Sequence, residues 1–258
     1  MVVQKERSGA SSNPPEDWYR QAFSLDYLNL YAHRNIEEAK QSIRTVIAEA
    51  RIGMGPVLDL CCGFGRHLTA LREVLPNPLI GCDLSQELLL HARHTVHVDA
   101  FLVQGDMRRI PFASGVFEAI LSFFTSFGYF PDDAENLQVL REVHRTLRKG
   151  GLFLFDFLNA PHVRNTLVPE SEEWFDGIRV KQKRWIDETQ STVNKRVQFF
   201  DEERLVREHY ERVKLYSPER LQTFFQETGL CVETVFGDYA GNDYQENSPR
   251  LIFMARKR

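Results

Sequence analysis

Acidic side chains and glycines follow three apolar runs of the sequence, each where a buried strand is expected to end. The first run, VLDL, contains Asp59 and precedes Gly63 and Gly65. The second run, LIGC, precedes Asp83, and the third precedes Asp106. Ligands of open α/β sheets bind outside the carboxyl ends of the strands. These residues therefore predict one ligand site shared by three loops.

The turn from Asp59 to Gly65 is suited to close contact with a ligand. Its glycines let the backbone approach, and the following helix N-terminus offers unpaired N–H groups. Asp59, placed before the glycines, can hold the ammonium of an amino-acid ligand, directly or through water. Dinucleotide-binding enzymes share such a turn, but the third glycine of their G-x-G-x-x-G pattern would fall at Leu68.

The other two acids fit the parts of a nucleoside. Asp83, about 20 residues beyond the glycine turn, can accept both hydroxyls of a ribose. Its alternative role is to cap the next helix, for which Ser85 competes. Asp106 can accept from the exocyclic amine of an adenine while Met107 packs on the ring. Taken alone, Asp106 is better explained as an exposed turn aspartate.

The motifs D-L-C-C-G-F-G, G-C-D-L-S, Q-G-D-M and R-K-G-G-L-F-L-F-D resemble the class I S-adenosylmethionine-dependent methyltransferases in order and spacing. The likeness covers about residues 27–156, and the chain looks like the bacterial small-molecule group with a β insertion after the fifth strand. It implies an enzyme that uses S-adenosylmethionine and releases S-adenosylhomocysteine. The implied cofactor site contains Tyr31, Asp59, Cys61, Gly63, Gly65, Asp83, Leu84, Asp106 and Met107.

Two positions in this site need comment. Cys61 stands where the family usually has glycine, and a small side chain is expected to fit there. The resemblance implies that Tyr31, and less directly Arg34, close over the cofactor from the N-terminal side. An ordinary packed aromatic is an equal alternative for Tyr31.

An aromatic segment, FFTSFGYF, follows the fourth expected strand, where the methyl acceptor of the family sits. Its rings can wall an apolar pocket or surround a sulfonium, although core packing explains at least half of them. The Asn/Asp-Pro-Pro-aromatic motif of DNA amino-methyltransferases is missing here. The acceptor is therefore expected to be a small molecule, in a pocket lined by Phe124, Phe127, Tyr129 and Phe130.

No acid–base group is assigned a catalytic role from the sequence. Methyl transfer is an in-line displacement that needs alignment and a dry site, and a base only when the acceptor must lose a proton. Asp156, His209 and Tyr210 are candidates, and a solvated strand face explains the last two equally well. Arg66 and His67, in the first turn after the glycines, are candidates to contact the cofactor carboxylate.

Alternating strands and helices from residue 57 predict a doubly wound, mostly parallel seven-stranded sheet. Five strands are expected by residue 157, and residues 231–236 and 251–255 supply two more. Between them, period-two alternation predicts an antiparallel meander of three strands, over residues 178–186, 193–200 and 205–215.

The expected organisation is a disordered tail over residues 1–15 and a methyltransferase domain over 16–258. Residues 165–215 are expected to be an inserted β subdomain, acting as a lid or a homodimer surface. The N-terminus has no apolar segment of the kind that signal peptides carry.

Composition narrows the partners of the 258-residue chain. Its formal net charge of −4 disfavours nucleic acid as a partner. The four cysteines lack metal-ligand spacing, so no metal is expected, and their apolar contexts fit a reducing cytoplasm. No apolar stretch is long enough to span a membrane. Two other functions stay open: a nucleotide-dependent oxidoreductase and a non-catalytic S-adenosylmethionine-binding protein.

Overall fold

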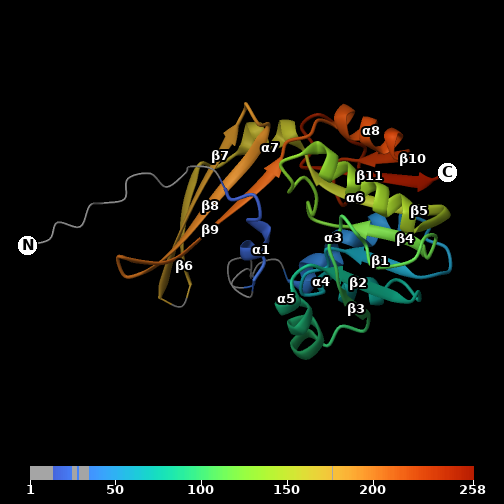
Figure 1. The fold of residues 1–258 in the computed structure, drawn as a ribbon, viewed down its shortest axis with the longest axis horizontal. Coiled ribbons are helices and arrows are strands. Elements are labelled where there is room, and N and C mark those ends of the chain that lie inside the picture. Colours follow the sequence, from blue (N-terminus) through green and yellow to red (C-terminus); the bar gives the residue numbers. More distant parts are fainter. Residues whose placement is uncertain (1–13, 25–27, 29–34, 176) are drawn as a thin grey trace, which may run out of the picture.

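The main sheet of the protein has seven strands. The computed structural model describes residues 14–24, 28, 35–175 and 177–258 (Figure 1). Strand order across the sheet is β10-β11-β5-β4-β1-β2-β3. Strands β1 to β5 are parallel to their neighbours within this set, and β11 pairs antiparallel with both β5 and β10. The bounds are β1 Val57–Leu60, β2 Leu79–Asp83, β3 Phe101–Gln104, β4 Phe117–Ser122, β5 Leu147–Leu158, β10 Leu230–Phe236 and β11 Arg250–Lys257. The expected doubly wound sheet is confirmed.

Helices cover both faces of this sheet because alternate strand residues are apolar on each side. One face packs against α3 (Ile36–Glu49), α4 (Arg66–Arg72) and α5 (Gln86–His91), which a π-helical turn, η1 (Ala92–Val96), extends. The other face packs against α6 (Asp133–Thr146) and α8 (Pro218–Glu227). Among the described residues, no helix is long and apolar enough to cross a lipid bilayer.

A second, four-stranded sheet follows helix α7 (Ala160–Thr166). It is an antiparallel meander of β6 (Glu170–Phe175), β7 (Ile178–Asp187), β8 (Thr192–Asp201) and β9 (Arg204–Lys214). In Figure 1 the meander extends to one side of the main sheet, and α1 (Tyr19–Ala22), which packs against β9, lies between it and α5. The expected meander is therefore present, with β6 as an additional edge strand.

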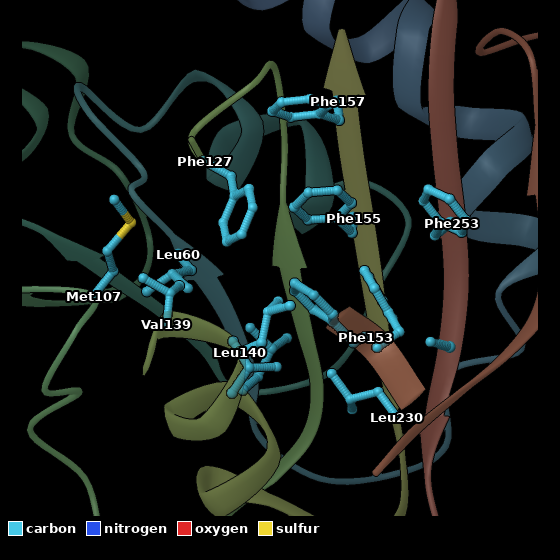
Figure 2. Packing of buried hydrophobic residues seen from close by; sticks show 14 of the residues in the cluster. Leu60, Met107, Phe127, Val139, Leu140, Phe153, Phe155, Phe157, Leu230 and Phe253 are labelled. Carbon is cyan, nitrogen blue, oxygen red and sulfur yellow. The ribbon is translucent and has the colours of Figure 1, made fainter. Parts of the chain in front are cut away.

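On the face of the main sheet that packs against α6 and α8, the core is built around phenylalanines on β5 (Figure 2). The Phe155 ring lies 5.2 Å from the Phe127 ring and 6.3 Å from the Phe253 ring, measured between centroids. Phe153 and Phe157 flank it on the same strand, each 5.6 Å away. Such aromatic pairs add about 0.5–1.5 kcal/mol each to the burial of their area.

We expect Phe155→Ala to lower the free energy of unfolding by about 3–5 kcal/mol, because it opens a cavity in this cluster. The matched control is Phe101→Ala on the edge strand β3, where the ring is 73% exposed. That substitution should change stability by less than about 0.5 kcal/mol. Urea denaturation of both variants measures the difference. Equal losses would contradict the proposed centre of the core.

Candidate active site

A cavity of about 430 Å³ opens at the carboxyl ends of the parallel strands. Its wall is formed by the loops that follow β1, β2, β3 and β4, together with α1 and the start of α5. Nine of the residues expected in the site line it: Cys61, Gly63, Asp83, Leu84, Asp106, Met107, Phe124, Tyr129 and Phe130. Asp59, Gly65 and Phe127 lie behind the wall, and Tyr31 and Arg34 fall outside the described residues.

The Asp83 carboxylate joins two of these loops. Its Oδ2 accepts the Gly63 N–H at 2.8 Å, and its Oδ1 accepts the Ser85 N–H at 2.8 Å. Ser85, not Asp83, caps α5, since its hydroxyl accepts the Leu88 N–H. Burial raises the pKa of Asp83, and the backbone hydrogen bonds oppose that shift. The carboxylate is thus fixed on the cavity wall by N–H donors.

The loop after β1 has left-handed backbone at Cys61, Gly63 and Gly65, with φ of 63°, 55° and 81°. Glycine adopts this conformation freely, whereas a residue with a side chain is strained there. A Cβ on Gly65 would lie 2.6 Å from Val98 Cγ2, so this glycine permits close packing and is not part of the wall. A Cβ on Gly63 would meet Leu88 at 3.9 Å, an ordinary contact.

Asp59 lies behind this loop on the buried strand β1. Its side chain is 1% exposed, and its Oδ2 has no hydrogen-bond partner among the described residues. Burial raises the pKa of Asp59 well above its usual range; the Asp83 charge raises it further and the Arg66 charge opposes. A buried carboxylate without a partner is unfavourable in its charged form.

The loop after β3 contains an ion pair that the sequence did not indicate. Arg108 donates to both Asp106 oxygens, with Nε–Oδ1 at 3.1 Å and Nη2–Oδ2 at 2.6 Å, and also to Glu135. Burial alone would raise the pKa of Asp106, but Arg108 holds it below its usual range. Met107 lies beside it, 8% exposed, with its Sδ 3.7 Å from the Cys61 sulfur. The Arg108 guanidinium also lies over the Phe130 ring, at 4.3 Å.

The aromatic segment after β4 divides between the cavity and the core. Phe124, Tyr129 and Phe130 line the cavity. Phe127 is 1% exposed and points toward Phe155 (Figure 2), so its expected place in the acceptor pocket was wrong. The Phe127 ring also lies 6.1 Å from the Phe157 ring and 6.0 Å from the Tyr216 ring, so it belongs to the core.

Five cavity residues of the N-terminal segment were missed: Tyr19, Arg20, Gln21, Phe23 and Ser24. The Tyr19 ring lies 5.5 Å from Phe130, and the Phe23 ring stacks on Tyr129 at 5.6 Å. Their only signal in the sequence is a short run of aromatic residues after the polar tail, which is too short to show a helical period.

The candidate bases lie away from the cavity. Asp156 is fully buried and paired with Arg250, while His209 and Tyr210 are on β9 of the meander. His67, in contrast, lines the cavity, with its ring 4.5 Å from Phe123. Burial, and then the Arg66 charge, lower the pKa of His67 well below its usual range, so its imidazole is neutral at neutral pH.

Leu68 stands where a dinucleotide-binding loop would have its third glycine. It is fully buried, and its Cδ1 would be 2.6 Å from a Cβ on Gly81 of β2. The helix therefore packs on the sheet through a leucine facing a glycine. No cluster of potential metal ligands occurs in the described ranges.

Comparison with known proteins agrees with this geometry. Residues 57–151 match the family model of a methyltransferase domain. The chain is 24% identical over 246 residues to YqeM of Bacillus subtilis, a proposed methyltransferase, covering 92% of this chain and 96% of that protein.

Two solved structures share the fold along nearly their whole length. A S-adenosylmethionine-dependent methyltransferase from Clostridium acetobutylicum superposes with a TM-score of 0.73 at 20% identity, covering 92% of this chain and 98% of that one. The sugar N-methyltransferase KedS8 from Streptoalloteichus gives 0.70 at 19% identity, covering 100% and 99%. The chain has the class I methyltransferase fold. Its residues 57–151 are similar to the methyltransferase domain of that family model, and the fold is the one that S-adenosylmethionine-dependent methyltransferases have.

We expect Asp59→Asn to stabilise the ligand-free protein at pH 8 by about 1–3 kcal/mol, since it removes a buried charge whose Oδ2 has no hydrogen-bond partner among the described residues. The raised pKa of Asp59 means that the folded state binds its proton more tightly than the unfolded state, whose pKa is about 3.9. The penalty is therefore small near pH 4, grows as the pH rises above the unfolded pKa, and levels off above the folded pKa.

Thermal unfolding of both proteins between pH 4 and pH 8 measures this. Wild type and Asp59→Asn should converge at the acidic end. A constant difference across the range would show that the carboxylate does not titrate as proposed.

Proposed function

We propose that the enzyme transfers a methyl group from S-adenosylmethionine to a small-molecule acceptor and releases S-adenosylhomocysteine. One observation carries the proposal: a single cavity joins the three strand-end loops to an aromatic wall after β4. Its volume of about 430 Å³ is typical of small-molecule sites. The fold shared with the sugar N-methyltransferase KedS8 supports an acceptor of this class.

The residues of the glycine loop fit the cofactor. Each Asp83 oxygen accepts one backbone N–H, which leaves acceptor capacity for the two ribose hydroxyls. The left-handed backbone at Cys61 and Gly63 brings the main chain to the cavity wall. Asp59, whose buried Oδ2 lacks a partner, would receive the ammonium of the methionine part, directly or through water.

The loop after β3 would hold the adenine. Met107 offers an apolar surface for the ring, and Leu84 lines the same cavity. Asp106 would accept from the exocyclic amine with the capacity that its pairing with Arg108 leaves. Tyr31, outside the described residues, stays a prediction.

Phe124, Tyr129 and Phe130 would form the acceptor side of the cavity. Bound cofactor supplies an electrophilic methyl group on a sulfonium, and aromatic faces attract such a cation by about 0.5–2 kcal/mol. The aromatic wall also excludes water, which keeps the acceptor aligned. For an acceptor that must lose a proton, the neutral imidazole of His67 is a titratable group on the same wall.

We further propose residues 16–258 as one catalytic domain, with residues 165–215 as an inserted lid or homodimer surface. The separate hydrogen bonding of the β6–β9 sheet supports the insertion. A cytoplasmic location is supported by the four cysteines, all of which are free thiols.

Calorimetry with S-adenosylhomocysteine tests the cofactor assignment. We expect wild type to bind and Asp83→Ala to bind about tenfold more weakly or worse, because a charge-assisted hydrogen bond contributes about 1.5–3 kcal/mol. The matched control is Asp99→Ala, whose side chain is 83% exposed and pairs with Arg72. It should bind like wild type. No binding by wild type would refute the function, and unchanged affinity in Asp83→Ala would remove Asp83 from the ribose role.

A panel of amino sugars, carboxylic acids and phenols then tests the acceptor, with release of S-adenosylhomocysteine as the signal. Turnover of a panel member identifies the acceptor class. Cofactor binding without turnover on a broad panel would favour the non-catalytic alternative.

A further inference from the structure

The turn that follows β4 is held in an unfavourable conformation. Phe124 and Thr125 are consecutive residues with side chains, and both have left-handed backbone, with φ of 59° and 66°. Each such residue costs roughly 1–2 kcal/mol. A pair of them persists only where the surroundings determine the backbone, as they often do at functional sites. This turn places Phe124 on the cavity wall.

The Asp156 carboxylate at the end of β5 holds the backbone of this turn. The Phe124 N–H donates to Asp156 Oδ2 at 2.6 Å, and the Thr125 N–H donates to the Asp156 carbonyl at 3.1 Å. The Tyr239 hydroxyl donates to the same Oδ2. Asp156 is fully buried, so these bonds form away from water, where they are strongest.

Arg250 on β11 completes the arrangement. It is a diagonal neighbour of Asp156 in the antiparallel register, in which Asp156 faces Ile252. Its Nε donates to Asp156 Oδ1 at 2.8 Å, and its Nη2 donates to the Thr125 hydroxyl at 2.7 Å. Burial lowers the pKa of Arg250, but the Asp156 charge outweighs this and raises it, so the guanidinium stays charged.

Two guanidinium groups lie over the Phe124 ring. The Arg250 guanidinium lies 5.3 Å from the ring centroid, and the Arg66 guanidinium lies 5.0 Å from it. Arg66 is in turn paired with Glu38 of α3. Backbone and ring of Phe124 are therefore both fixed by groups outside the turn.

We propose that Asp156, Arg250 and Tyr239, named here the Asp156 clamp, are positioning residues that hold Phe124 as the acceptor-side wall. In the described part of the chain none of the three lines the cavity, so they act through Phe124. Misplacing reacting groups by 1 Å costs about 100-fold in rate, which makes a fixed wall valuable. The inference rests on the proposed function, because it takes Phe124 as part of the acceptor site.

Tyr239→Phe tests the Asp156 clamp, because it removes the hydroxyl that donates to Asp156 and keeps the aromatic ring. The matched control is Tyr244→Phe, whose hydroxyl donates to Asn159 at 3.2 Å and does not contact the turn. Both proteins are labelled with 4-fluorophenylalanine and studied by fluorine NMR. The resonance of Phe124 is assigned by its loss in Phe124→Leu.

We expect Tyr239→Phe to shift or broaden the Phe124 resonance, while Tyr244→Phe and the exposed Phe101 resonance stay unchanged. S-adenosylhomocysteine affinity, measured by calorimetry, should change by less than about twofold. For any panel member that is methylated, its KM should rise, or its kcat fall, by about fivefold or more. A second pair of variants separates the hydroxyl of Thr125 from its bulk: Thr125→Ser should keep the wild-type resonance and Thr125→Val should shift it.

Three outcomes would overturn the clamp. The Phe124 resonance could be unmoved in Tyr239→Phe while the melting temperature falls, which means a role in stability alone. In Tyr239→Phe the affinity for S-adenosylhomocysteine could fall while the Phe124 resonance shifts. The Asp156 clamp would then act on the cofactor site and not on the acceptor wall. Acceptor kinetics could be unaffected despite the shift. Failure of the proposed function is a different result, namely absence of S-adenosylhomocysteine binding by wild type.

Discussion

The acceptance of two backbone N–H groups by the Asp83 carboxylate is the interaction on which the cavity depends. One N–H comes from Gly63 in the loop after β1 and the other from Ser85 at the start of α5. Parallel strands bring these two loops to the same edge of the sheet, but they do not fix their separation. The carboxylate does so, and it faces the cavity with the capacity to accept a ligand hydroxyl. Loop geometry and the proposed ligand recognition thus use one side chain.

Two carboxylates lie close together at the cavity wall, Asp83 on the wall and Asp59 behind it. Asp59 and Asp83 lie close enough for the charge of one to raise the pKa of the other. Two buried carboxylates near each other are unfavourable without a cation. A ligand with an ammonium group would relieve this, and the protein would gain stability on binding it. The proposed cofactor has such a group, so its binding would lower this electrostatic cost.

Much of the fold could be predicted from the sequence, because the buried strands are continuous apolar runs and α3 has a helical period with Asn35 as its cap. β6 was not predicted, since Glu170–Phe175 is an edge strand with glutamates at three of its six positions and no alternation of apolar residues. Its residues face lysines on β7, as in the Glu172–Lys181 pair, and such pairing depends on the neighbouring strand. The pattern of apolar residues within Glu170–Phe175 therefore does not indicate this strand.

The residues of the candidate site could likewise be predicted only in part from the sequence. The loop acids could be placed because each follows its strand directly in sequence. Phe127 could not be separated from Phe124, since their opposite directions follow from the backbone of the turn between them. The partner of Asp156 was equally hidden, because Arg250 lies 94 residues away and meets it only through the pairing of β5 with β11.

Arg66 links the two halves of the cavity. It is the first residue of α4, directly after the loop that Asp83 holds, and its guanidinium lies over the Phe124 ring. Its charge is balanced by Glu38 on α3, so a cation that is 6% exposed can be retained at this position. A displacement of the glycine loop would therefore be felt at Phe124. The same contact couples the positions of the glycine loop and Phe124, as the proposed in-line transfer between cofactor and acceptor would require.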